Sequence, residues 1–276
     1  MSLSDVTWPR NPASIPPLQL AVTAALDASS ADRDVARAAA ARHGLPFAPR
    51  RGRSLAAVAA QAGAEALLVL SPRRSALFVD GAEHPWRAGM AALRVKRLLS
   101  GERVTVDGFL DAAGLRPGDA LLDATLGMGM DALVAAAAVG AGGRVVGVEA
   151  SRALAALAAE GLARCELEAA RRVEVVHGDA AALLGSLPAR SFDVVVFDPM
   201  FRYGRAAASG FDLVRRLADP RPLAPETLAR ARQVARRWVV VKDGTPGWDL
   251  IRLGLQPIPS ARGAKKMYAR VEAEAG

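Results

Sequence analysis

Between residues 120 and 242 the sequence alternates short apolar stretches with longer segments rich in alanine and leucine. The apolar stretches have the length and composition of strands buried on both faces: 120–124, 144–149, 173–177, 193–198 and 238–242. The segments between them have helical spacing: 130–139, 151–164, 180–186 and 225–236. Strands that alternate with helices build an open parallel sheet with helices on both faces. We therefore predict an α/β fold with a doubly wound, mostly parallel, Rossmann-like sheet.

The remaining segments predict two further strands of this sheet and a second, smaller unit. Short strands near 252–257 and 266–272 are expected to form a closing hairpin, which gives a seven-stranded sheet in a domain spanning 105–276. Residues 1–17 are expected to be irregular, and residues 18–104 to form a small basic α/β domain. The expected elements of that domain are a strand within 18–26, helices Ser30–His43 and Ser54–Ala62, strands 66–70 and 75–80, and a helix Pro85–Leu99.

Composition limits the class of protein and its compartment. Hydrophobic residues make up 51% of the 276, so a sizeable core can form. The longest apolar run, 132–139, is too short to span a bilayer, and the N-terminus does not resemble a signal peptide. Cys165 is the only cysteine, so no disulfide can form within one chain and a cytoplasmic location is expected. The three scattered histidines predict no metal site.

The charge balance favours an anionic partner. The net charge is +8 and the sequence pI is about 10.6, which is typical of proteins that bind nucleic acid. Residues 1–107 contain 14 basic and 9 acidic residues, so the front unit is the more basic part per residue. An alternative interpretation stays open, because only four of the 36 basic residues are lysine. Biased base composition of the gene could account for much of that arginine excess.

A glycine-containing turn follows the first strand of the larger unit. In LLDATLGMGMDA (121–132) the strand ends at Asp123, and Gly127 and Gly129 lead into a helix. Glycines allow a tight turn and a close approach of the backbone to a ligand. Glu149 ends the next strand, where an acidic side chain can accept hydrogen bonds from two ribose hydroxyls. This spacing suits NAD as well as other nucleotide cofactors.

The acidic residues around the turn favour S-adenosylmethionine (SAM) over NAD. Asp123 can attract the ammonium group of a methionine moiety, whereas it would repel a pyrophosphate. Asp179 follows the third strand, where it can accept a hydrogen bond from an adenine amino group, and Asp198 follows the fourth. Each has a structural alternative when taken alone. Asp123 could cap its turn, Glu149 could be an exposed helix start, and Asp179 could be a helix N-cap.

The sequence VVVFDPMF (194–201) indicates chemistry on a flat molecule with an amino group. The Asp198 carboxylate and the Pro199 carbonyl could both accept hydrogen bonds from an exocyclic amine and direct its lone pair. Proline fixes the turn in which these acceptors lie. Phe201 could stack on the base, although a place in the core is the alternative.

These motifs resemble a known family. DATLGMGMDA, VVGVEAS, VHGDAAAL and VVVFDPMF look like the motif series of class I SAM-dependent methyltransferases. Together with VVVKDG (239–244), they are similar to the small-subunit rRNA guanine-N2 methyltransferase family RsmJ and to its Gram-positive relatives. Thr125 stands where the common methyltransferase loop has its first glycine, and RsmJ-type sequences share this threonine. The resemblance implies SAM contacts at Met130, Asp131, Glu149, Ala150, Asp179, Ala180 and Asp198. Met130 and Ala150 stand where RsmJ proteins have other residues, the first of them basic.

The expected function is that of a cytoplasmic SAM-dependent N-methyltransferase acting on an exocyclic amine of a nucleic-acid base. The resemblance to RsmJ indicates guanine N2 of 16S rRNA, either free or in the small ribosomal subunit. Basic residues are candidate RNA contacts near the site and in the front unit: Arg202, Arg205, Lys242, Arg94 and Arg97. Two alternatives stay open, namely methylation of a small-molecule or protein amine, and a non-catalytic RNA-binding or assembly factor with a SAM pocket.

Overall fold

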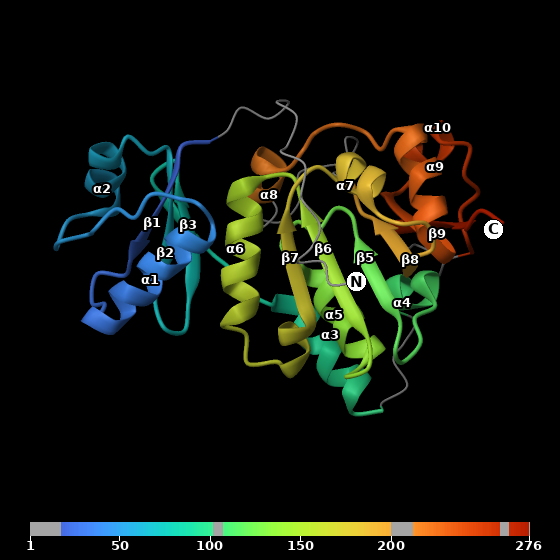
Figure 1. Ribbon diagram of the computed structural model, residues 1–276, viewed down its shortest axis with the longest axis horizontal. Coiled ribbons are helices and arrows are strands. Elements are labelled where there is room, and N and C mark those ends of the chain that lie inside the picture. The colour runs from blue at the N-terminus through green and yellow to red at the C-terminus, as the bar shows by residue number, and fades with distance from the viewer. Residues whose placement is uncertain (1–17, 102–106, 200–211, 260–264, 276) are drawn as a thin grey trace.

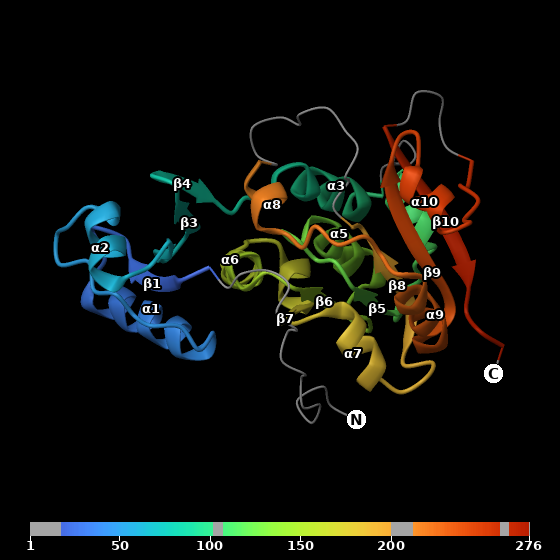
Figure 2. The same cartoon turned by 90° about the horizontal axis from the view of Figure 1, so that it is seen from above.

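The protein contains two sheets that lie side by side, with helix α6 (Arg152–Ala163) between them (Figures 1 and 2). The computed structural model describes residues 18–101, 107–199, 212–259 and 265–275. The expected irregular segment 1–17 lies outside this part of the chain. No helix among the described residues is both long and apolar enough to pass through a bilayer.

The larger sheet has the predicted doubly wound, mostly parallel arrangement. Its strand order is β10-β9-β8-β5-β6-β7, and only β10 runs antiparallel to its neighbour. The strands are β5 (Ala120–Asp123), β6 (Arg144–Glu149), β7 (Val173–His177), β8 (Phe192–Phe197), β9 (Ala235–Gly244) and β10 (Lys266–Glu272). The chain builds outward from β5 through β6 to β7 and then returns to place β8 on the other side of β5. Ligands bind at such a switch point in open α/β sheets.

The described residues form six strands in this sheet rather than the predicted seven. The expected strand near 252–257 is absent there, because residues Trp248–Arg252 form helix α10 and Pro257 makes only an isolated bridge to Ala269. The predicted hairpin is thus reduced to β10 and one bridge. Short apolar segments fit a buried helix as well as a strand, and here Leu250 is buried beneath β9 as part of a helix.

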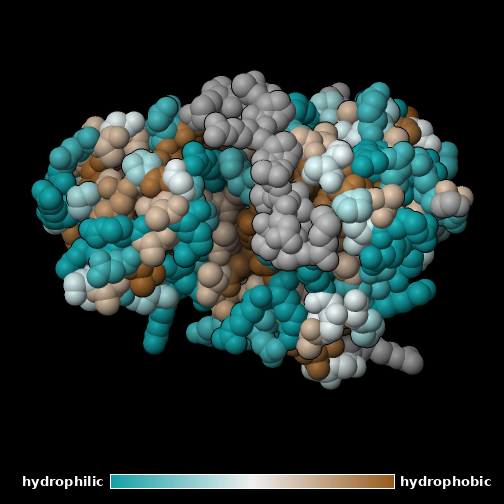
Figure 3. Space-filling model, viewed as in Figure 1, coloured by the Kyte–Doolittle hydropathy of each residue, from teal (hydrophilic) through white to brown (hydrophobic). Residues whose placement is uncertain are grey.

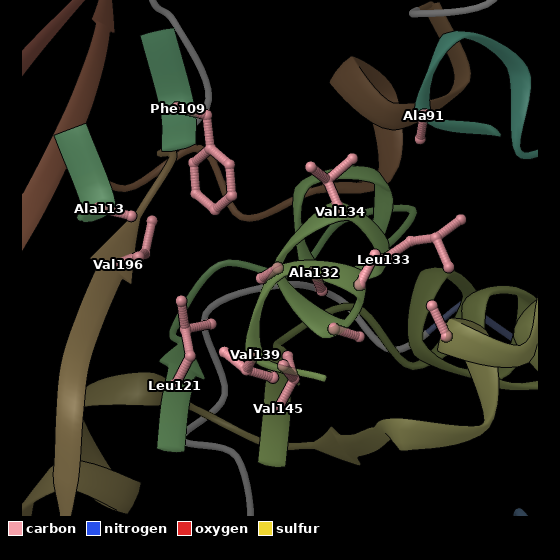
Figure 4. Packing of buried hydrophobic residues seen from close by; sticks show 14 of the residues in the cluster. Ala91, Phe109, Ala113, Leu121, Ala132, Leu133, Val134, Val139, Val145 and Val196 are labelled. Atoms are coloured by element: carbon pink, nitrogen blue, oxygen red, sulfur yellow. The ribbon is translucent and has the colours of Figure 1, made fainter. Parts of the chain in front are cut away.

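Helices cover both faces of the larger sheet. On one face lie α3 (Gly89–Leu99), α4 (Gly108–Ala113) and α5 (Met130–Val139), whose buried side chains meet those of β5, β6 and β8 (Figure 4). On the other face lie α7 (Ala180–Ser186), α9 (Pro225–Val234) and α10. The short helix α8 (Asp212–Leu217) packs on α6, and a 3₁₀ turn, η2 (Glu168–Arg172), precedes β7.

Helix α3 corrects the predicted boundary between the two units. It was expected in the front domain, 18–104, but Ala91 and Val95 are buried against α5 in the core of the larger unit. The boundary therefore falls between the end of β4 at Pro85 and the start of α3 at Gly89. The apolar face of α3 is what decides this, because a helix must bury that face wherever a complementary surface exists.

The smaller sheet has the order β1-β2-β3-β4, with β1 parallel to β2 and the other pairs antiparallel. Its strands are β1 (Leu20–Ala24), β2 (Ala66–Leu70), β3 (Ser75–Val79) and β4 (Ala82–Pro85). Helix α1 (Ser30–Arg42) covers one face and α2 (Leu55–Ala62) the other, and each begins after a serine N-cap. Strand β4 is short and half-exposed, so it lacks the apolar pattern that predicts a strand.

Helix α6 is shared by the two units. Ala153, Ala156 and Leu157 pack under the small sheet, whereas Ala158 and Leu162 belong to the core of the larger one. Hydrophobic colour accordingly gathers in the recess between the two units in Figure 3. The buried Glu160 carboxylate accepts hydrogen bonds from Arg42, His43 and Arg164. Burial opposes this charge, but His43 and the arginines keep the pKa of Glu160 below its usual range.

The contact between Trp86 and Gly161 provides a test of this interface. A Cβ atom added to Gly161 would lie 2.2 Å from Cγ of the Trp86 ring. We expect Gly161→Ala to lower the free energy of unfolding by about 1–3 kcal/mol, as overpacked cores do. Gly185→Ala in α7 is the matched control, because its added Cβ meets nothing within 4 Å and alanine favours a helix. Thermal unfolding midpoints measure both, and equal midpoints for the two variants would contradict the expectation.

Candidate active site

Four carboxylates lie along the C-terminal edge of the larger sheet. Asp123 ends β5, Glu149 ends β6, Asp179 follows β7 and Asp198 follows β8. These strands are neighbours in the order β8-β5-β6-β7, so their ends meet at one edge. The sequence places each carboxylate at a strand end, and the sheet brings them together as predicted.

The glycine-containing turn between β5 and α5 is held in shape from two sides. Gly127 and Gly129 adopt φ angles of +55° and +77°, which side chains other than glycine rarely adopt. The Gly127 amide donates a 2.8 Å hydrogen bond to Oε2 of Glu149. The Trp86 indole, from the segment between the two units, donates a 3.0 Å hydrogen bond to the Met128 carbonyl. A Cβ at Gly127 would meet nothing within 4 Å, so the turn leaves room beside its backbone.

Asp123 and Glu149 are buried, and their carboxyl groups are hard to ionise. Asp123 and Glu149 are each only 5% exposed to solvent. Burial raises the pKa of Asp123 to about 7, against one hydrogen bond from the Thr125 amide at 3.1 Å. Burial likewise raises the pKa of Glu149 to about 7, against bonds from the amides of Ser151 and Gly127. The turn-capping alternative for Asp123 is therefore realised, and the carboxyl group still lies at the site.

Asp179 is engaged at both of its oxygens. Oδ1 accepts a 2.9 Å hydrogen bond from the Ala182 amide, so Asp179 is the N-cap of α7. Oδ2 accepts a 2.6 Å hydrogen bond from Nη2 of Arg221, which also pairs with Asp219. No motif in the sequence identifies Arg221, which lies 42 positions along the chain from Asp179. A carboxylate oxygen has two lone pairs, so Oδ2 can accept one further donor.

A chain of ion pairs connects Asp198 to the interior. Lys242, at the end of β9, donates from Nζ to Oδ2 of Asp198 and to Oδ2 of Asp131, the latter at 2.8 Å. Oδ1 of Asp131 accepts a 2.6 Å bond from Arg94, whose other nitrogens contact Asp107 at 2.7 and 2.9 Å. Arg94 and Lys242, the two candidate RNA contacts in this network, face inward between carboxylates, because their neutralising partners are buried beside them.

Within this network, the effects of burial and of neighbouring charges oppose one another. Burial raises the pKa of Asp198, and the ammonium group of Lys242 opposes that shift. Burial also acts on Asp131, but Lys242 and Arg94 together hold the pKa of that carboxyl well below its usual range. Burial would lower the pKa of Lys242, yet Asp198 and Asp131 raise it, so the lysine stays protonated. Asp131, predicted as a cofactor contact, therefore acts in the structure as the counter-ion shared by two cations.

Asp198 is positioned with its side chain partly open to solvent. The side chain is 31% exposed, whereas that of Lys242 beneath it is 5% exposed. The Asp198 amide donates a 2.5 Å hydrogen bond to Oγ1 of Thr125, which links the end of β8 to the glycine-containing turn. This contact gives a structural reason for a threonine where a loop glycine is usual. Pro199 is buried next to it.

The other predicted residues fall into two groups. Met130, Ala150 and Ala180 are half-buried at the same edge of the sheet, and Arg97 is exposed on α3. Phe201, Arg202 and Arg205 lie outside the described residues. Within the described ranges, no group of three or more histidine, cysteine, aspartate or glutamate side chains is arranged to hold a metal ion.

The edge suits a cationic ligand rich in hydrogen-bond donors. The carboxylate side chains at this edge are hydrogen-bond acceptors, and there is free space beside the backbone of Gly127. SAM carries an ammonium group, a sulfonium, ribose hydroxyls and an adenine amino group, each of which can donate to or attract a carboxylate. A pyrophosphate group carries only hydrogen-bond acceptors, so it could not bond to the carboxylate acceptors Asp123 and Glu149 at this edge, and a dinucleotide fits it poorly.

Comparison with known proteins agrees with this chemistry. The sequence model of the family described as "Putative SAM-dependent methyltransferase" matches residues 60–250. Uncharacterized protein YpiP of Bacillus subtilis is 40% identical over 184 residues, covering 64% of this chain and 70% of YpiP. Ribosomal RNA small subunit methyltransferase J of Laribacter hongkongensis is 43% identical over 133 residues, 44% of this chain and 45% of that protein, so the chain spans about half of its length.

A solved structure shows the same fold. The crystal structure of a SAM-dependent methyltransferase from Neisseria gonorrhoeae aligns with a TM-score of 0.60 at 22% sequence identity. The alignment covers 92% of this chain and 96% of that one.

Proposed function

Because the chain belongs to the family of SAM-dependent methyltransferases, and SAM is its cofactor, we propose that it methylates the N2 amino group of a guanine in small-subunit rRNA. The observation that carries the proposal is Asp198. It is a partly exposed carboxylate, followed by a buried proline, at the same sheet edge as the glycine-containing turn. Relatives named ribosomal RNA small subunit methyltransferase J, at 32–43% identity, support rRNA as the substrate.

The carboxylate series supports a binding position for each part of the cofactor. In this proposal Asp123 and the Gly127–Gly129 backbone hold the methionine portion, Glu149 accepts from the ribose hydroxyls, and Asp179 accepts from the adenine amino group. When bound, SAM supplies an electrophilic methyl group. Met130, Ala150 and Ala180 line the same edge with half-buried side chains, so they contribute shape and not charge.

Asp198 and its neighbours prepare the acceptor amine. The lone pair of an exocyclic amine is delocalised into the base, which makes the nitrogen a poor nucleophile. The Asp198 carboxylate accepts a hydrogen bond from that amine, and the Pro199 carbonyl supplies a second acceptor. Together they favour a more tetrahedral nitrogen and hold its lone pair in line for transfer. Burial raises the pKa of Asp198, whereas Lys242 favours its ionised form, in which the carboxylate can take up the proton that the methylated nitrogen releases.

Binding of SAM is expected to release protons. Asp123 and Glu149 have pKa values near 7 in the free protein, and donors of the ligand favour their ionised forms. Binding therefore lowers both pKa values, and the association constant rises as the pH increases from 6 to 7.5. Linkage limits the rise to about tenfold per pH unit for each carboxyl group. Calorimetry in buffers of different ionisation enthalpy measures the released protons.

Glu149→Gln is the variant that checks the origin of this pH dependence. It removes one of the two titrating groups and is expected to reduce both the proton release and the slope of affinity against pH. An association constant that falls between pH 6 and 7.5 in the unaltered protein would contradict the assignment of these carboxylates to SAM.

The proposed substrate is tested by mass spectrometry of modified nucleosides. Small-subunit rRNA from cells with and without the gene is digested, and the lost methyl mark is mapped to its nucleotide. The expected result is loss of N2-methylguanosine at one position, restored by the intact gene and not by the Asp198→Asn form. An unchanged set of rRNA modifications would overturn the proposal, and transfer to a small amine would then be the reaction to test.

A further inference from the structure

A surface of aromatic and basic side chains lies beside the carboxylate edge, where β9 leads into α10. Trp248 and Ile251 are 51% and 60% exposed and lie one helical turn apart on α10. Lys265 and Lys266, before and at the start of β10, are also exposed. We call these four residues the β9–β10 platform.

Several backbone contacts hold the two segments of the platform together. Lys266 pairs with Gly244 in the antiparallel ladder, and the Thr245 amide donates a 3.3 Å hydrogen bond to the Lys265 carbonyl. A Cβ added to Gly247 would lie 3.1 Å from Sδ of Met267, so the turn before Trp248 packs directly on β10. The position of Trp248 relative to the lysines is therefore set by regular structure.

The platform is continuous with the active site. Although Lys266 reaches solvent, the protein around it lowers its pKa by partial desolvation, and the nearby ammonium group of Lys242 lowers it further, whereas Asp131 and Asp198 oppose the shift. Lys266 is thus close enough to Asp198 to interact with its charge. The ladder also places Tyr268 opposite Lys242, two positions along the same strand from Lys266.

The exposed charge of the platform is positive. The two aspartates in this region, Asp243 and Asp249, are 5% and 4% exposed. Asp243 is engaged by the amides of Gly244, Asp249 and Leu250, and Asp249 contacts Arg252. What reaches solvent is an indole, an aliphatic side chain and two ammonium groups.

We propose that the β9–β10 platform binds the single-stranded RNA next to the target nucleotide, with one base stacked on Trp248 and phosphates contacted by Lys265 and Lys266. The inference rests on the proposed function and deepens it. Aromatic stacking on any base, combined with a basic track along the backbone, is how proteins hold single strands. Such contacts position the strand and leave the choice of base to the pocket around Asp198.

The first test measures binding of a fluorescein-labelled, mixed-sequence single-stranded RNA 12-mer to the full chain by anisotropy. Trp248→Ala is expected to weaken binding about tenfold, and Trp248→Phe much less, because phenylalanine still offers a stacking face. Lys265→Ala combined with Lys266→Ala is expected to reduce the slope of log affinity against log salt by about 1.4, because each phosphate contact to a single strand contributes about 0.7. Arg171→Ala is the matched control, an exposed cation before β7 at the opposite edge of the sheet, and should leave both quantities unchanged.

A second readout separates this surface from the catalytic residues. SAM affinity should be the same in Trp248→Ala as in the unaltered protein. In methylation of rRNA the variant should raise KM with little change in kcat. Affinity and salt slope equal to the unaltered protein in both the tryptophan and the lysine variants would overturn the proposal and indicate a protein or other partner for this face.

Failure of the platform and failure of the proposed function give different results. If the methyl mark on rRNA depends on the gene but the platform variants bind and methylate normally, only the platform assignment is wrong. If no rRNA mark depends on the gene, the proposed function is wrong. Any RNA binding through the platform would then not serve methylation of rRNA.

Discussion

Replacing Asp198 by asparagine is expected to lower the rate of methyl transfer by about 100- to 10,000-fold, the range observed when a group that positions or accepts a proton is removed. Asparagine keeps the size of the side chain and the hydrogen bond of its backbone amide to Thr125. It removes the negative charge that orients the amine and takes its proton. Single-turnover transfer of a radiolabelled methyl group to rRNA measures the loss, and calorimetry should show a far smaller change in SAM affinity.

Asp193 provides a control on the same strand. It lies near the other end of β8, where it accepts a hydrogen bond from the Ala120 amide and pairs with Arg236. Asp193→Asn should therefore affect stability slightly and leave transfer nearly unchanged. If Asp198→Asn turned over as fast as Asp193→Asn, the proposed role of Asp198 would be excluded, whatever the identity of the substrate.

Replacing Lys242 by methionine is expected to destabilise the fold by about 3 kcal/mol and to abolish most of the activity. The variant leaves Asp198 without its ammonium partner and leaves Asp131 with Arg94 alone. Removing one member of a buried ion pair is costly because the remaining charge is poorly solvated. Denaturant unfolding gives the stability change, and the transfer assay gives the loss of activity.

A double variant distinguishes the charge of Lys242 from its packing. Asp198→Asn combined with Lys242→Met removes both members of the pair, so most of the lost stability should return while activity stays low. The non-additive part of the two stability changes measures their interaction. Simple additivity of the two variants would show that the lysine stabilises the fold through its second partner, Asp131, and not through Asp198.

Much of the site could be predicted because its signals are local. Asp123, Glu149, Asp179 and Asp198 each follow an apolar strand directly, and parallel strands present their C-terminal ends at one edge. The two glycines of the turn were also predictable, since a strand that leads at once into a helix needs residues that tolerate positive φ. These inferences require the order of residues along the chain and no long-range contact.

The sequence by itself therefore determined the doubly wound sheet and the carboxylates at its edge. Only the tertiary structure decided which charged side chains are neutralised by partners inside the protein. Arg94 and Lys242 look like RNA contacts in the sequence, but Asp131 bonds to Lys242 from 111 positions away and to Arg94 from 37 positions away. Trp86 reaches the glycine-containing turn in the same way, across 42 positions. Such pairings follow from how α3, α5 and β9 pack, because burial forces each charge to find a partner that no local pattern specifies.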